Sequence, residues 1–221
     1  MCGRFTISKE KEDVVKFLND YFQVTIPGDF DLPRYNVSPG QKILAVLFDG
    51  ENHRAGLIPW DYKINHHGRY KQMINARSES VDGLYAFKKA FKSKRCLIVA
   101  DGFYEWDQSS KQPYRIEKHN QGLYFYAGIY DGKVIGGKKH FGALILTTEA
   151  NPLIKKHHPR MPVMLEGQMA KQYLNDSLSA EAVKLLLHPY PEEKMTIYPV
   201  SKDVNNGKND TSDLIKKTTN N

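Results

Sequence analysis

Cysteine is scarce in this sequence, with two among 221 residues, Cys2 and Cys96. If Cys2 acts as a nucleophile, the two thiols form no structural disulfide, and the expected setting is a reducing, intracellular one. Two distant cysteines and eight scattered histidines also lack the spacing of metal ligands. We therefore expect neither a metal nor another cofactor.

Long apolar runs are missing as well. No run approaches the roughly 18 residues of a membrane-spanning helix, and no secretory signal is visible at the start of the chain. The sequence thus predicts a cytoplasmic protein without a membrane partner.

Acidic residues are outnumbered, with 25 Asp and Glu against 32 Lys and Arg, which leaves a net charge of +7. Thirteen Tyr and ten Phe make the chain rich in aromatic side chains. A basic and aromatic surface is suited to the phosphates and bases of a nucleic acid, although charge alone does not prove such a partner.

Short strand patterns outnumber helical ones along the chain. Apolar residues at helical spacing predict a helix over 14–21, and Asn151-Pro152 has the pattern of a capped helix start. Five apolar residues over 96–100 predict a buried strand. The strands are too closely spaced for a repeat of alternating strands and helices, so we expect an α+β fold built mainly on antiparallel strands with a few short helices.

The chain length fits one domain, which we place at residues 1–206. Residues 207–221 are mostly Asn, Lys, Thr, Asp and Gly, which predicts a polar, flexible tail. Residues 61–70, with His66 and His67 side by side, are expected to form an exposed basic loop. We expect a monomer.

Cys2 would become the first residue if Met1 were removed. It would then carry an α-amine and a thiol on adjacent carbons, with ordinary pKa values of about 7.7–8.0 and about 8.5. Such a pair can capture an aldehyde, because the amine forms an imine and the thiol closes on the same carbon to give a thiazolidine. The plain alternative is a start codon followed by a buried cysteine.

Four stretches resemble one protein family in order and spacing. They are Met1-Cys2-Gly3-Arg4-Phe5, Asn75-Ala76-Arg77-Ser78-Glu79, Ala100-Asp101-Gly102-Phe103-Tyr104-Glu105-Trp106 and His158-Pro159-Arg160-Met161-Pro162. Together they resemble the SOS-response-associated peptidase (SRAP) family of abasic-site processing proteins, from Met1 to about Asn206. Pro159 departs from the usual pattern, which has an acidic or amide residue there.

The resemblance implies a sensor and processor of abasic sites in single-stranded DNA, acting in DNA repair and the SOS response. Cys2 would form a thiazolidine crosslink to the open-ring aldehyde and so shield the lesion. The family has also been assigned AP-lyase and autopeptidase activities, the latter proposed to expose the cysteine. The positions of Asn75, Glu105 and His158 match the family's other catalytic residues.

The chemistry of these three side chains fits those roles. His158 can give or take the proton needed to open the closed sugar. Glu105 lies between Tyr104 and Trp106, where partial desolvation would raise its pKa into a range useful for acid-base work. Asn75 can donate and accept hydrogen bonds, or can simply cap a turn.

Other residues are candidates for DNA contacts. Arginines near the proposed catalytic groups can bind phosphates, a tryptophan after a proline can stack on a base, and the remaining candidates can contact the backbone. They are Arg4, Pro39, Trp60, Arg77, Thr147, Thr148 and Arg160. Core packing is the alternative for Trp60, and surface charge is the alternative for the arginines.

Two other functions stay open at this point. Cysteine and glycine after the initiator also begin the N-terminal-nucleophile amidohydrolases, in which the thiol attacks an amide. A module that binds single-stranded DNA without a covalent step would explain the charge but give Cys2 no role.

Overall fold

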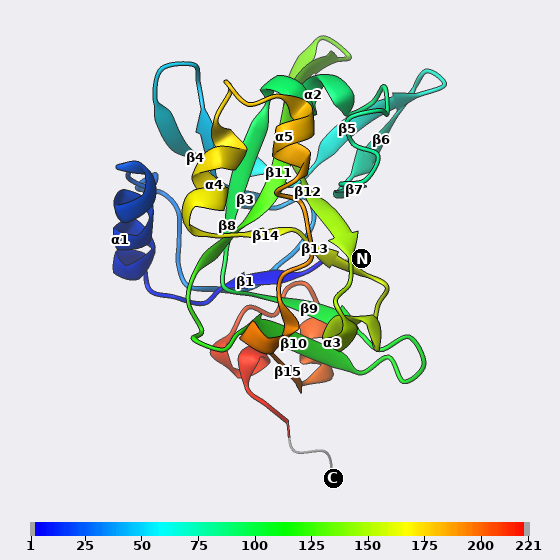
Figure 1. Cartoon of the computed structure of the whole chain (residues 1–221). Coiled ribbons are helices and arrows are strands. Elements are labelled where there is room, and N and C mark those ends of the chain that lie inside the picture. Colours follow the sequence, from blue (N-terminus) through cyan, green and yellow to red (C-terminus); the bar gives the residue numbers. More distant parts are fainter. Residues whose placement is uncertain (1–2, 219–221) are drawn as a thin grey trace.

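The computed structural model describes residues 3–218 and has two main sheets that share one core (Figure 1). The smaller sheet has five strands in the order β15-β10-β9-β1-β2, all antiparallel to their neighbours. Its strands are β1 (Phe5–Ile7), β2 (Arg34–Val37), β9 (Gly102–Trp106), β10 (Pro113–Lys118) and β15 (Met195–Pro199).

The larger sheet has the order β13-β12-β11-β8-β3-β4, with β14 added on β11 and β7 added on β12. The β7–β12 pair is parallel, and all other strand pairs of the larger sheet are antiparallel. Its strands are β3 (Lys42–Phe48), β4 (His53–Pro59), β7 (Asn75–Arg77), β8 (Arg95–Ala100), β11 (Tyr124–Ile135), β12 (Lys138–Glu149), β13 (Arg160–Pro162) and β14 (Met164–Leu165).

A separate two-stranded hairpin consists of β5 (Tyr62–His66) and β6 (Arg69–Met73). It projects beside β7 at one end of the large sheet (Figure 1). The expectation of a loop over 61–70 is therefore wrong, because Tyr62 and Ile64 pair across to Met73 and Lys71. The residues at its tip are exposed, as the sequence predicted.

The helices are short and lie around the sheets. They are α1 (Lys11–Phe22), α2 (Lys88–Ser93), α3 (Pro152–Lys155), α4 (Gly167–Leu174) and α5 (Ala180–Lys184), with 3₁₀ turns η1 (Glu192–Lys194), η2 (Lys202–Asn205) and η3 (Ser212–Ile215). The expected α+β fold with mainly antiparallel strands is confirmed.

Local sequence explains two of these helices well. Val14, Leu18 and Phe22 recur at helical spacing and are the buried face of α1. Asn151 caps α3, since its side chain accepts a hydrogen bond from the Ile154 amide. Both elements were expected from the sequence.

Aromatic rings fill the space between the two sheets. The ring of Phe5 in β1 packs edge-on against Tyr126 of β11 and against Trp60, at centroid separations of 5.7 and 5.4 Å. Phe103 of β9 meets the same Tyr126 ring at 6.5 Å. Residues of the small sheet that alternate with these must therefore face away from the shared core.

That outer face is covered by the end of the chain, shown red in Figure 1. Leu214 is 2% exposed and forms a second apolar cluster with Tyr104, Val200 and Val204. The Tyr104 hydroxyl donates to the Tyr35 carbonyl within this layer. Residues 207–218 are therefore part of the folded unit, and the prediction of a flexible tail is wrong for them.

Candidate active site

Glu105 lies in β9 on the face that points toward the larger sheet. The strand alternates, with Phe103 in the main core and Tyr104 in the second cluster, so Glu105 shares the face of Phe103. Its side chain is buried, with 2% of the residue exposed. Burial disfavours the ionised form and raises the pKa of Glu105 to about 7. A carboxyl with such a pKa can both give and take a proton near neutral pH.

The start of the chain runs alongside Glu105. In the β1–β9 pair, Phe5 lies opposite Phe103 and Thr6 lies opposite Gly102. The Tyr104 amide donates to the Arg4 carbonyl at 3.0 Å, which continues the pairing toward the N-terminus. The same antiparallel register brings Gly3 level with Glu105. Met1 and Cys2, where the predicted nucleophile falls, lie outside the described residues.

Asn75 is positioned by the short strand β7. Asn75 is 6% exposed and pairs in parallel with Ile145 of β12. Two residues on, Arg77 is exposed and pairs with Thr147. The strand therefore buries the amide and presents the guanidinium to solvent.

His158 follows α3 and precedes β13. Its Nδ1 atom lies 3.0 Å from both the backbone nitrogen and the backbone oxygen of Arg160, which fixes the ring. Burial lowers the pKa of His158 below its ordinary value, and the nearby charge of Arg160 lowers it further. The imidazole is therefore neutral at pH 7 and suited to accept a proton.

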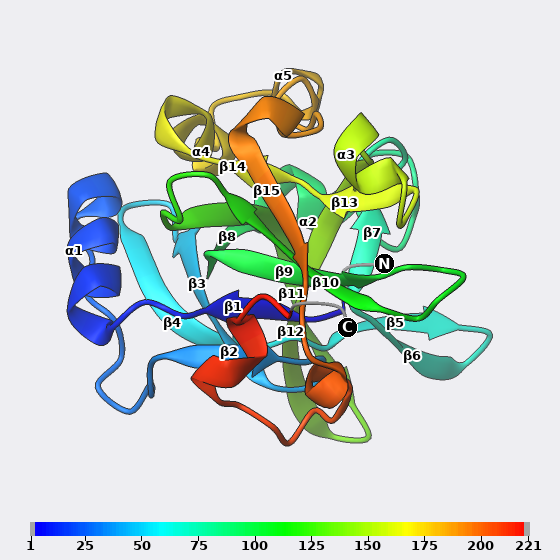
Figure 2. The ribbon, with the colours of Figure 1, turned by 90° about the horizontal axis from the view of Figure 1, so that it is seen from below.

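One strand brings the elements of Asn75 and His158 together. Thr147 of β12 pairs with Arg77 of β7 on one side and with Pro162 of β13 on the other. β13 and α3 lie next to each other in both views (Figure 1 and Figure 2).

A ring contact joins this group to the strand next to Glu105. Tyr114 of β10 lies opposite Glu105 and packs against His157, with 4.3 Å between the ring centroids. His157 Nδ1 also lies 3.3 Å from Asp107 Oδ2, just beyond β9. Strand pairing and this ring contact thus link the segments of Asn75, Glu105 and His158, whose catalytic roles stay predictions.

Comparisons with known proteins identify the family of this chain. Residues 1–207 match the family described as SOS response associated peptidase (SRAP). The chain belongs to the SRAP family. It is 37% identical to the abasic site processing protein YoqW of Bacillus subtilis, over 98% of this chain and 99% of that protein.

Two further relatives show how widely the likeness extends. The Escherichia coli abasic site processing protein YedK is 29% identical over 98% of this chain and 99% of its own. A crystal structure of a Bacteroides thetaiotaomicron protein superposes with a TM-score of 0.80 at 20% identity, covering 99% of this chain and all of the other. The latter likeness concerns the fold alone.

Trp60 of this SRAP protein does not offer a stacking surface. It is 0% exposed, its ring packs on Phe5, and its indole nitrogen donates to the Ile74 carbonyl at 2.8 Å. The prediction that Trp60 stacks on a DNA base is wrong for this conformation, because the preceding strand turns the ring into the core.

The two predicted threonines are buried as well. Thr147 and Thr148 are 2% and 5% exposed, and the Thr147 hydroxyl donates to the Ala76 carbonyl. Both residues belong to the part of β12 that pairs with β13, where Thr147 lies opposite Pro162 and Thr148 lies opposite Met161. Pro39 is half-buried in the turn between β2 and β3.

Two of the predicted DNA-binding arginines have protein partners. The Arg160 guanidinium makes two bonds to the Glu79 carboxylate, at 2.6 and 2.8 Å, and another to the Thr147 carbonyl. Arg4 donates to Asn36 Oδ1 at 2.8 Å and to the Val204 carbonyl at 2.7 Å. Arg4 thus ties the first strand to the end of the chain.

Asn36 is a structural residue that the sequence analysis did not single out. Its side-chain amide donates to the backbone carbonyls of Val204, Asn206 and Asn209. Tyr114 was not predicted as a neighbour of the site, and no local pattern marks it, because it acts through a contact with a distant segment. Glu79 ends one of the four family motifs and His157 directly precedes another, but the sequence does not show that they contact Arg160 and Tyr114.

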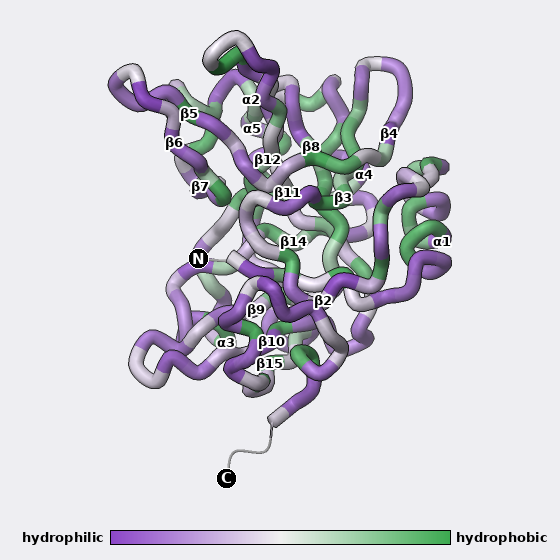
Figure 3. Tube along the Cα trace, turned by 180° about the vertical axis from the view of Figure 1, so that it is seen from behind, coloured by the Kyte–Doolittle hydropathy of each residue, from purple (hydrophilic) through white to green (hydrophobic). Residues whose placement is uncertain are grey.

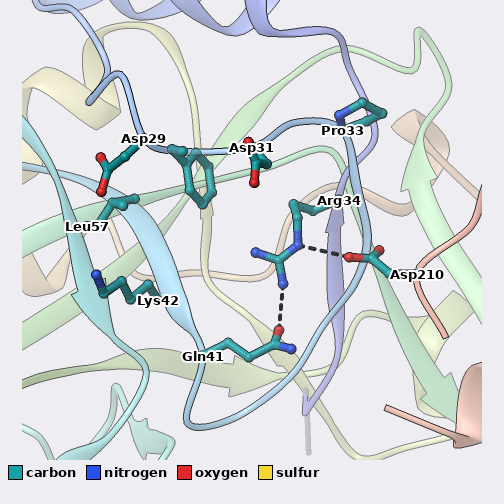
Figure 4. Close-up of a pocket in the computed structure, with 9 residues that line it drawn as sticks. Asp29, Asp31, Pro33, Arg34, Gln41, Lys42, Leu57 and Asp210 are labelled. Atoms are coloured by element: carbon teal, nitrogen blue, oxygen red, sulfur yellow. Dashed lines mark hydrogen bonds and ion pairs between the residues drawn. The ribbon is translucent and has the colours of Figure 1, made fainter. Parts of the chain in front are cut away.

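Another cavity lies away from this site and holds side chains that pair with one another. It measures about 570 Å³ and is lined in part by Asp29, Arg34, Lys42 and Asp210 (Figure 4). Arg34 donates to Asp210 at 2.9 Å and to Gln41 at 2.7 Å. The bond to Asp210 fastens the end of the chain to β2.

Two further observations apply to residues 3–218. Within this range the structure contains no cluster of three or more His, Cys, Asp or Glu that could hold a metal ion. None of the helices described is long and apolar enough to span a membrane.

Cys96 is fully buried, and burial raises the pKa of its thiol, which disfavours the reactive thiolate.

Proposed function

We propose that this protein recognises abasic sites in single-stranded DNA and links to them covalently through Cys2. The observation that carries this proposal is the register of β1 against β9. It directs the start of the chain toward a buried carboxyl, Glu105, whose pKa is raised to about 7. Relatives along the full chain are named abasic site processing proteins.

The covalent step begins once Met1 has been removed. Hydrolysis of the Met1–Cys2 peptide bond consumes one water and frees the α-amine of Cys2. The amine then attacks the open-ring aldehyde and releases water to give an imine. The thiol adds to the imine carbon and its proton passes to nitrogen, which closes a thiazolidine. The crosslink shields the lesion from strand cleavage.

Each nearby side chain has a role in this scheme. His158, neutral at pH 7, accepts the sugar hydroxyl proton as the closed sugar opens. Glu105 gives a proton to the leaving water and takes one back when the crosslink reverses. Asn75 orients the amine or the sugar oxygen through its amide.

We propose two further activities, of which only the AP-lyase reaction starts from this imine. The autopeptidase reaction comes before it, because cleavage frees the amine that forms the imine. In AP-lyase chemistry, a proton is lost from the carbon next to the imine and the bond to the 3′ phosphate breaks. In autopeptidase chemistry, the Cys2 thiol assists cleavage of the bond that precedes it. Both use Cys2 and Glu105, so both should be lost with the crosslink.

DNA binding is proposed to use the exposed Arg77 together with Arg160, which exchanges Glu79 for a phosphate. Affinity for undamaged single strands should then fall steeply with salt. A flat salt dependence would show that the positive charge of the chain is not used for DNA.

Intact-mass spectrometry tests the covalent proposal. The protein is measured alone and after incubation with a single-stranded oligonucleotide that carries one abasic site. We expect loss of Met1 and an adduct equal to the oligonucleotide minus one water, which survives denaturation. Cys2→Ala should form no adduct, whereas Cys96→Ala should form it normally.

The remaining outcomes discriminate the alternatives. A protein with a free Cys2 that forms no adduct would overturn the covalent proposal and favour a non-covalent DNA-binding module. Release of ammonia from glutamine, dependent on Cys2, would favour an N-terminal-nucleophile amidohydrolase. Glu105→Gln should slow the adduct far more than it weakens DNA binding, and equal losses would contradict its acid-base role.

A further inference from the structure

The positive charge of this protein is concentrated in two segments. Residues 62–73 contain two Lys and one Arg, and residues 84–95 contain four Lys and one Arg, while neither segment contains Asp or Glu. These eight positive residues exceed the net charge of the whole chain, +7, so the rest of the sequence is nearly neutral. The excess charge is therefore local.

The fold places the two segments against each other. The first is the β5–β6 hairpin, which Figure 3 shows as largely hydrophilic, and the second includes α2. The ring of Tyr62 packs on Phe87 at 5.8 Å, and the Tyr62 hydroxyl donates to the Ala86 carbonyl at 3.1 Å. Arg69, Lys71, Lys88, Lys89 and Lys92 are exposed around this junction.

A cleft of about 400 Å³ opens between the segments, within the size range of small-ligand sites. Three tyrosines and three lysines contribute to its lining, which is more aromatic and basic than that of the other large cavity. They are Tyr62, Tyr70, Tyr85, Lys88, Lys89 and Lys133.

Tyr85 is the most unusual of these residues. It is 91% exposed, although large aromatic side chains are usually at least partly covered. The ammonium of Lys88 lies over its ring at 5.9 Å, and Tyr70 across the cleft is 41% exposed. An exposed ring beside lysines is the pattern with which proteins stack unpaired bases and hold the phosphates between them.

The negative charge of Asp131, which also lines the cleft, does not repel an anionic ligand. Asp131 forms ion pairs with Lys94 at 2.5 Å and with Lys133 at 3.6 Å, so its charge is offset. Lys133 also lies 5.1 Å from the centre of the Tyr62 ring. The cleft is thus positive on balance.

The hairpin is anchored and leads straight to the proposed active site. Gly142 of β12 allows this anchoring, because a Cβ there would overlap the Asp61 carbonyl at the base of β5. β6 ends at Met73, two residues before Asn75. The five residues of β6 span about 17 Å, the length of about five stacked nucleotides, and Tyr62 in the wall of the cleft pairs with Met73.

We propose that this cleft binds unpaired nucleotides of the same DNA strand, several positions away from the abasic site. This inference rests on the proposed function, because it assumes that the strand is anchored at Cys2. Tyr85 stacks on a base, and Lys88 and Lys89 contact the flanking phosphates. The protein would then select a lesion that has a stretch of unpaired DNA on one side.

The test uses the full chain and two sets of single-stranded oligonucleotides. Undamaged strands of increasing length measure affinity by fluorescence anisotropy at several salt concentrations. A second set of strands carries an abasic site near one end and about ten nucleotides on either its 5′ or its 3′ side. This extension is longer than the path from the proposed active site to the cleft. A short abasic strand with no extension reports the covalent step alone.

We expect wild-type affinity to rise once the strand is long enough to reach the cleft. Tyr85→Ala should reduce affinity for long strands by about fivefold or more, while Tyr85→Phe keeps the ring and should retain it. Lys88→Ala with Lys89→Ala should reduce the slope of log affinity against log salt by about 1.4. Lys171→Ala with Lys202→Ala removes the same charge at exposed positions away from the cleft and should leave the length-dependent gain intact.

The results separate the two proposals. All cleft variants should crosslink the short abasic strand at the wild-type rate, and only one of the two extensions should depend on Tyr85. Normal crosslinking with no loss in Tyr85→Ala on either extension would overturn the cleft proposal and leave the proposed function standing. A wild-type protein with free Cys2 that fails to crosslink the short strand would overturn the proposed function itself.

Discussion

The ring of Tyr114 packs against the imidazole of His157, with 4.3 Å between centroids and a tilt of 35°. Tyr114 pairs with Glu105 across the small sheet, and His157 directly precedes His158. This contact therefore ties the loop of His158 to β10, the strand that pairs with the strand of Glu105. It positions two groups that the proposed chemistry needs close together.

Loss of this ring contact should slow the chemistry without weakening DNA binding. We expect Tyr114→Ala to reduce the rate of crosslinking to an abasic strand by about tenfold or more, because misplaced groups lose the advantage of proximity. Tyr114→Phe keeps the ring and should be close to wild type. Gel-resolved crosslinking rates and anisotropy with undamaged DNA measure the two effects, and a parallel loss of affinity would contradict a positioning role.

Burial of Glu105 should make the stability of the protein depend on pH. Its pKa is about 7 in the folded protein and about 4.5 when unfolded, so the folded state holds one more proton between these values. Stability should therefore fall as pH rises from about 4.5 to about 7, by about 3 kcal/mol for this group.

Glu105→Gln provides the comparison for this pH dependence. Its neutral amide cannot ionise, so its free energy of unfolding should lack the decline that wild type shows over that range. Urea unfolding of both proteins at a series of pH values measures the difference. Identical pH profiles would show that the Glu105 carboxyl is not held in a desolvating site.

The ion pair between Glu79 and Arg160 should compete with DNA. Removal of the Glu79 charge frees the guanidinium for a phosphate, so Glu79→Gln should raise affinity for single strands by up to about fivefold at low salt. Glu193→Gln makes the same charge change at an exposed position and should have less effect. Arg160→Ala should lower affinity and reduce the salt slope by about 0.7. Unchanged affinity in both Glu79→Gln and Arg160→Ala would remove Arg160 from the DNA path.

The end of the chain should contribute to folding. Leu214 is 2% exposed, so Leu214→Ala should lower the free energy of unfolding by about 2–3 kcal/mol. Leu185 is 82% exposed, and Leu185→Ala should change it by less than about 0.5 kcal/mol. Urea unfolding compares the two, and equal small effects would mean that residues 207–218 do not stabilise the fold.

Local patterns predicted the elements that depend on nearest neighbours along the chain. The apolar spacing of α1 and the cap at Asn151 each act within one or two helical turns, and both are present. The alternation of side chains along a strand also explains why Glu105 shares the face of Phe103 and not that of Tyr104. The motifs around Cys2, Asn75, Glu105 and His158 indicated the family.

Features that depend on distant partners could not be predicted in this way. Trp60 follows a proline at a strand end, a position that is compatible with an exposed or a buried ring. In the structure the ring is buried because it packs on Phe5. The polar composition of 207–218 suggested a tail, yet Leu214 finds the outer face of β9. Helix α4 was missed because its short apolar pattern needs β8 and β11 to bury it.

By itself the sequence determined helix α1, the capped start of α3, the family and the excess of positive charge. Tertiary structure alone decided that β1 runs along Glu105, that Thr147 joins β7 to β13, and that the segments 62–73 and 84–95 meet at one cleft. The physical reason is that strand pairing and burial join residues far apart in the chain. The order of residues along the chain indicates which residues can pair in a strand or be buried. It does not indicate which distant segment each of them will contact.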